Sequence, residues 1–198
     1  MTTYDFGDGK GPVPAHQHKN PNGTTGGWVA DTATVAATVY LGPNAQVSGN
    51  AKVFGTAQVS GDAKVFDNAK VFDNAKVSGD AMVYGTAQVF GDAMVYGNAI
   101  VSGDAKVFDN AMVSGTAMVS CKEDILFGFA GAHSWTAYPL KDGTIFLQYG
   151  CEGHSLQKWE ILHELLSVKH TRNVNNAAIT KAICQLVEIQ LVKNKLLT

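Results

Sequence analysis

The chain has 198 residues and a formal net charge of −2, with 45% hydrophobic and 16% charged residues, a composition suited to one main folded domain and a smaller one. Lysines and aspartates nearly balance along residues 45–122, which argues against the basic stripe of a nucleic-acid groove. The first 22 residues are polar and no long apolar run occurs, so we expect neither a signal peptide nor a membrane span.

Residues 1–26 form a leader rich in Gly, Pro and Asn. Its three prolines exclude a regular helix, so we predict an irregular cap that folds over the open end of the next domain. His16 and His18 are two residues apart, and in an extended chain they would face the same side and could share a metal ion. No carboxylate or cysteine lies close in sequence, so hydrogen-bonded histidines of a cap are favoured and no metal is assigned.

Residues 27–122 are sixteen consecutive hexads without an insertion, most of them Ala-x-Val-x followed by Gly or Asp and then by Asp, Asn or Thr. A period this strict identifies a repeat architecture. Ala and Val are two apart, so both point to one side of an extended segment, and the last two positions form a corner. Three such hexads close a triangular coil of 18 residues. The domain is therefore predicted to be mainly β, a parallel β-helix of a little over five coils.

The 18-residue coil sorts the outward positions into three faces. On one face the residue after each Val is aromatic in four successive coils, at Phe54, Phe72, Phe90 and Phe108. An exposed apolar row of this kind is typical of an interface, and closed symmetry favours contact between copies of the chain. The alternative is that the rings lie flat on one another beneath lysine stems. We assign these four residues as a candidate oligomer interface.

After residue 122 the period ends, and residues 123–198 are predicted to form a small α+β (ββαα) domain. The segments SWTAYPL and TIFLQYG flank Lys141-Asp142-Gly143, which indicates a β-hairpin. Ser155 is a suitable N-cap for a helix to about residue 169, and a second helix is expected from about 176 to 193. We expect this domain to dock on the last coil.

The Gly-rich loops of residues 123–198 supply the candidate ligand site. Backbone N–H groups in such loops, with nearby His and Ser side chains, can hold a small anion; a tight loop with surface histidines fits the sequence equally well. The loops would lie at opposite ends of the hairpin strands, or close together if they fold back. The assigned residues are His133, Ser134, Gly150, Cys151, Gly153 and His154.

Several motifs together resemble a group of phage and prophage hexapeptide-repeat proteins that are often labelled transferases. They are Pro-Val-Pro-Ala-His at 12–16, Gly-Gly-Trp-Val-Ala-Asp-Thr-Ala at 26–33, the hexads, and Gly-Cys-x-Gly at 150–153. The resemblance covers nearly the whole chain. It implies a left-handed coil, a homotrimer, and a location in the cytoplasm of the bacterial host or on the virion; three cysteines without metal-type spacing also favour a reducing cytoplasm.

Three functions follow from these observations. The first is a non-catalytic binding or structural module that captures a host protein or a small anionic or nucleotide ligand, with an anti-defence role, through the tail or a groove between subunits. The second is an acyltransferase that uses a coenzyme A thioester; its relatives place a catalytic His beside a loop inserted in a coil, and the hexads here contain neither. The third is a virion accessory protein. No catalytic residue and no cofactor is assigned.

Overall fold

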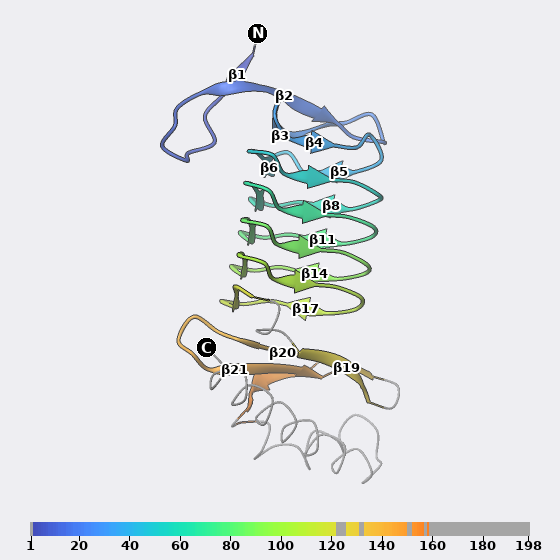
Figure 1. Cartoon of the computed structure of the whole chain (residues 1–198). Helices are drawn as coiled ribbons and strands as arrows, with labels where there is room; N and C mark the ends of the chain where they lie inside the picture. The colour runs from blue at the N-terminus through green and yellow to red at the C-terminus, as the bar shows by residue number, and fades with distance from the viewer. Residues whose placement is uncertain (1, 122–125, 131–132, 150–151, 157, 159–198) are drawn as a thin grey trace. The chain divides into compact units, whose positions relative to one another are not determined.

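The computed structural model describes residues 2–121, 126–130, 133–149, 152–156 and 158. The chain divides into two compact units, Met1–Lys122 and Glu123–Thr198. In the first unit the hexads form a parallel β-solenoid of about five turns, with coils about 18 residues apart (Figure 1). The second unit contains a small antiparallel sheet. The predicted β-helix with a separate tail domain is therefore confirmed at the level of fold class.

Three parallel sheets make the walls of the solenoid, and each wall takes every third strand (Figure 1). Wall 1 consists of β6 (Gln46–Val47), β9 (Lys64–Val65), β12 (Met82–Val83), β15 (Ile100–Val101) and β18 (Met118–Val119). Wall 2 consists of β4 (Thr34–Val35), β7 (Lys52–Val53), β10 (Lys70–Val71), β13 (Gln88–Val89) and β16 (Lys106–Val107). Wall 3 consists of β5 (Tyr40–Leu41), β8 (Gln58–Val59), β11 (Lys76–Val77), β14 (Met94–Val95) and β17 (Met112–Val113).

The core of the solenoid is built from the Ala and Val of each hexad. Val71 pairs in register with Val53 of the preceding coil and Val89 of the following coil. From residue 45 to residue 119, every Ala and Val at the two inward hexad positions is fully buried. Burial of each Val contributes roughly 1.5–3 kcal/mol before conformational entropy is subtracted. The two-residue period inside each strand therefore places the side chains as predicted.

The corners between strands need residues that accept a left-handed backbone. At most corners this residue is Gly, and at three it is Asp, at Asp67, Asp73 and Asp109, with φ between 54° and 59°. A Cβ on Gly55 would lie 2.7 Å from the backbone N of Asp73 in the next coil. Asp is one of the few residues that tolerate this conformation. Its side chain also bonds to the next coil, where Asp73 Oδ2 accepts a hydrogen bond from Gly91 N at 3.3 Å.

The leader is not irregular, and this prediction is wrong. β1 (Thr3–Tyr4), β2 (Val13–Lys19) and β3 (Thr25–Ala30) pair antiparallel, and β3 continues wall 1 by parallel pairing with β6. Prolines exclude a helix, but a strand tolerates them where their missing N–H is not required; Pro14 still accepts a hydrogen bond from Asp31 N at 2.9 Å. Packing around Phe6, which is buried, holds these strands together.

One buried side chain of the leader completes the edge of the first coil. Asn20 Oδ1 accepts a hydrogen bond from Leu41 N at 2.8 Å, and Asn20 Nδ2 donates to Leu41 O at 3.0 Å. The carboxamide thus replaces the neighbouring strand that Leu41 lacks on this side. His18 Nε2 lies 3.0 Å from Val39 O and does the same for that carbonyl. These backbone N–H and C=O groups at the open end of the solenoid therefore have hydrogen-bond partners within the chain.

The second unit contains an antiparallel sheet in the order β19 (Leu126–Ala130), β20 (His133–Pro139), β21 (Ile145–Tyr149) and β22 (Glu152–Ser155). The predicted hairpin around residues 141–143 is confirmed as β20 and β21, but two further strands flank it. A helix begins at Leu156, and Ser155 Oγ accepts a hydrogen bond from Lys158 N at 3.4 Å. The remainder of the two predicted helices lies outside the described residues.

Val71→Asp is expected to abolish cooperative unfolding, because a carboxylate without a partner in the core costs several kcal/mol. Lys70→Asp is the matched control, since Lys70 is adjacent and exposed; we expect a change within about 0.5 kcal/mol. Circular dichroism during thermal unfolding measures both. A Val71→Asp protein that melts like the wild type would contradict the inward position of Val71.

Asn20→Ala is expected to lower the free energy of unfolding by about 1–3 kcal/mol, because the N–H and C=O of Leu41 lose their partners in a buried position. Asn50→Ala is the control: Asn50 is exposed and makes a 3.5 Å contact with Asn68. Denaturant unfolding compares the two. Equal effects would show that Asn20 does not complete the edge of the first coil.

Candidate functional site

Four aromatic rings form a continuous column on wall 2, which we call the aromatic ladder. Its members are Phe54, Phe72, Phe90 and Phe108. Successive ring centroids are 4.9, 4.8 and 5.3 Å apart, and the ring planes differ by 5°, 1° and 10°. The coil-to-coil step is therefore also the spacing at which aromatic rings stack.

Stacking covers the faces of these rings and leaves their edges outward. Phe54 is 40% exposed, and the other three rings are half-buried. The sequence left open whether the rings lie flat on one another, and they do. Beside the ladder, Lys52, Lys70 and Lys106 are exposed. The wall therefore presents ring edges next to a row of ammonium groups.

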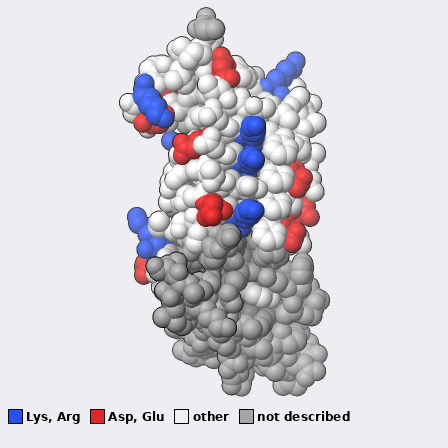
Figure 2. Space-filling view, in the orientation of Figure 1, with Lys and Arg blue, Asp and Glu red and all other residues white. Residues whose placement is uncertain are grey.

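Basic and acidic side chains are interspersed on the described surface. On the side of the molecule drawn in Figure 2, short rows of each sign alternate with uncharged residues, and neither sign covers a wall. Among the described residues, no group of three His, Cys, Asp or Glu side chains is placed to hold a metal ion. The same residues include no helix with the length and apolar character needed to cross a membrane.

In the tail sheet, the strand ends that flank the two candidate loops lie at one end. Trp135 of β20 pairs with Gly128 of β19 and with Tyr149 of β21. The strand ends that border residues 131–132 and 150–151 therefore lie at the same end of the sheet. The loops themselves, and with them the choice between the two arrangements that the sequence allowed, lie outside the described residues.

The candidate residues of the tail fall into two groups. His133 begins β20 opposite Ala130, while Gly153 and His154 lie on β22 opposite Gln148 and Leu147. A Cβ on Gly153 would overlap the end of the Gln148 side chain and lie 2.7 Å from the Phe146 ring, so a larger residue here would have to displace both. Gly150 and Cys151, and the side chains of His133 and Ser134, lie outside the described residues.

The two leader histidines do not share a side of their strand. A β-bulge lies between Gln17 and Lys19, so that His16 is exposed and His18 is buried. His16 Nδ1 lies 2.8 Å from Asp31 Oδ1, whereas His18 is bonded to Val39 O. A shared metal ion would require both histidines to face the same side of the strand, as residues two apart normally do. This premise is wrong, because the bulge reverses the alternation of side chains between His16 and His18.

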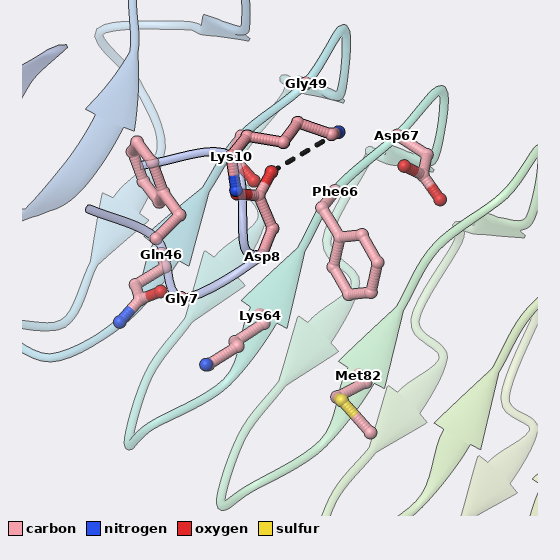
Figure 3. Close-up of a pocket in the computed structure, with 11 residues that line it drawn as sticks. Gly7, Asp8, Lys10, Gln46, Gly49, Lys64, Phe66, Asp67 and Met82 are labelled. Carbon is pink, nitrogen blue, oxygen red and sulfur yellow. Dashed lines mark hydrogen bonds and ion pairs between the residues drawn. The ribbon is translucent and has the colours of Figure 1, made fainter. Parts of the chain in front are cut away.

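A groove that the sequence did not indicate lies between the leader and wall 1 (Figure 3). It has a volume of about 270 Å³. The loop after β1 contributes Gly7, Asp8 and Lys10, and wall 1 contributes Gln46, Lys64 and Phe66. The leader is mostly polar, but it contains the aromatic residues Tyr4 and Phe6. These two residues are the feature of its sequence that could have indicated packing against wall 1.

A family model described as YdcK beta solenoid repeat matches residues 87–103, a stretch just short of one coil. This match supports a β-solenoid repeat protein and concerns the repeat alone. No curated protein and no solved structure shows significant similarity to the chain.

Proposed function

We propose that the chain is a binding and structural module without catalytic activity, and that it assembles with copies of itself through the aromatic ladder of wall 2. The observation that supports this proposal is the ladder itself, four nearly parallel rings at a regular spacing of about 4.8–5.3 Å. Ring edges in a straight row are an apolar surface that a second rigid wall of the same spacing can cover. A homotrimer is the state that the family resemblance implies.

Acyl transfer is the catalytic alternative to a binding role. Such a mechanism needs a general base within about 2.6–3.2 Å of the acceptor group. The hexads contain no histidine. In the leader, His18 is buried against Val39. His16 is exposed and bonds to Asp31 through Nδ1, a pairing that orients an imidazole and leaves its Nε2 available. Acyl transfer stays the less favoured alternative because no loop is inserted in the hexads to form a site.

A second candidate function is capture of a small anionic ligand or of a host protein by the tail sheet. It is favoured by the strand ends that border residues 131–132 and 150–151, which lie at the same end of the sheet. In the phage setting that the resemblance implies, a rigid solenoid would carry this binding end, in the host cytoplasm or on the virion.

The double variant Phe72→Glu with Phe90→Glu is expected to give a folded monomer. The rings point outward, so the core is unchanged, while two carboxylates in successive coils repel a second copy. Size-exclusion chromatography with light scattering measures the mass. Ser60→Glu with Ser78→Glu, at the equivalent positions of wall 3, is the control and should keep the wild-type mass. An unchanged mass in the Phe variant would contradict assembly through wall 2.

A further inference from the structure

The groove between the leader and wall 1 lies at the end of a second aromatic column. Phe66 stacks on Tyr84 with ring centroids 4.8 Å apart and planes inclined by 8°. One coil nearer the leader, the equivalent position is Ser48, which has only a hydroxymethyl group. On wall 2 the corresponding column continues through four rings. Ser48 is therefore at the position that the next ring of the column would occupy beside Phe66, and its short side chain does not fill the space of a ring.

A hydrogen-bond acceptor in the groove has no donor. Gln46 is two residues before Ser48 and lies on the same side of the strand. Its Nε2 donates to the hydroxyl of Tyr4 at 3.3 Å. Its Oε1 is buried, and within the described residues it accepts no hydrogen bond. A buried acceptor of this kind is unfavourable until an N–H or O–H group reaches it.

The groove is lined by two lysines and two aspartates, of which Lys10 and Asp8 pair with each other. Asp8 accepts a hydrogen bond from Lys10 N at 3.0 Å and pairs with Lys10 Nζ at 3.3 Å, as Figure 3 shows. The backbone N–H of Lys10, together with its ammonium group, keeps the pKa of the Asp8 carboxyl below its usual value. Asp67 accepts from Gly85 N. In the described part of the chain, neither Asp67 nor Lys64 has an ion-pair partner, and Lys64 is half-buried.

We propose that this groove binds a small aromatic carboxylate that carries a ring N–H or O–H donor. The ring stacks on Phe66 at the level of Ser48, the donor bonds to Gln46 Oε1, and the carboxylate faces Lys64. A volume of about 270 Å³ is at the lower limit of small-molecule sites, which favours a ligand of one ring or of two fused rings. The site is on wall 1 and does not depend on assembly through wall 2.

Titration of the full chain with 4-hydroxybenzoate and with indole-3-carboxylate, followed by calorimetry or NMR, tests the proposal. We expect saturable binding of at least one of them. Three matched probes each lack one feature of 4-hydroxybenzoate: benzoate lacks the donor, phenol lacks the carboxylate, and trans-4-hydroxycyclohexanecarboxylate lacks the planar ring. Each is expected to bind about tenfold more weakly.

Ser48→Phe is the most direct variant, because its ring would occupy the step above Phe66 and extend the column. We expect a folded protein that no longer binds the acid. Ser102→Phe extends the same column at its other end, one coil beyond Tyr84, and should bind normally. Lys64→Gln should weaken binding of 4-hydroxybenzoate about tenfold and leave binding of phenol unchanged. Lys76→Gln, on wall 3, is its control.

Several results would overturn the proposal. They are the absence of saturable binding by both acids at millimolar concentration, equal binding of the cyclohexane analogue, and full affinity in a folded Ser48→Phe protein. If Ser48→Phe does not fold, the comparison of Lys64→Gln with Lys76→Gln decides, and equal affinities in these two variants would overturn the proposal.

Discussion

The contact of each coil with the coil 18 residues away is the interaction on which the whole solenoid depends. The strands of the walls are two residues long, far too short to be stable as isolated pairs. Stability comes from repetition: Lys70 N donates to Ala87 O at 2.9 Å, and Val71 lies between Val53 and Val89. A coil at the end of the stack lacks one neighbour. In the first coil, Asn20 and His18 supply the missing backbone partners.

The same register that stacks the core also stacks the exterior. Every outward position is repeated one coil later, so a Phe after Val becomes a column of rings and a Lys before Val becomes a row of charge. Both proposed surfaces derive from this repetition. The aromatic ladder is an unbroken column on wall 2, and the groove lies where the column on wall 1 gives way to Ser48. Neither surface needs a loop inserted in a coil.

The sequence was sufficient for the solenoid because its information is periodic. Inward Val71 and outward Lys70 follow from the two-residue alternation, and the ladder follows from the 18-residue coil. The leader is not periodic, and its structure depends on distant contacts. Nothing near Asn20 shows that its amide bonds to Leu41, 21 residues later, and no spacing rule reveals the bulge that turns His16 and His18 apart. The groove escaped prediction because it forms only when the loop after β1 lies against wall 1.

The central claim is that the 18-residue coil, rather than the chain length, is the unit of stability. The most direct measurement compares denaturant unfolding of a protein that lacks residues 69–86, one whole coil, with one that lacks residues 69–77, half a coil. We expect the full-coil deletion to unfold cooperatively and to be the more stable of the two, although it removes more of the core, because every remaining strand keeps its wall. A half-coil deletion that is as stable or more stable would contradict this account.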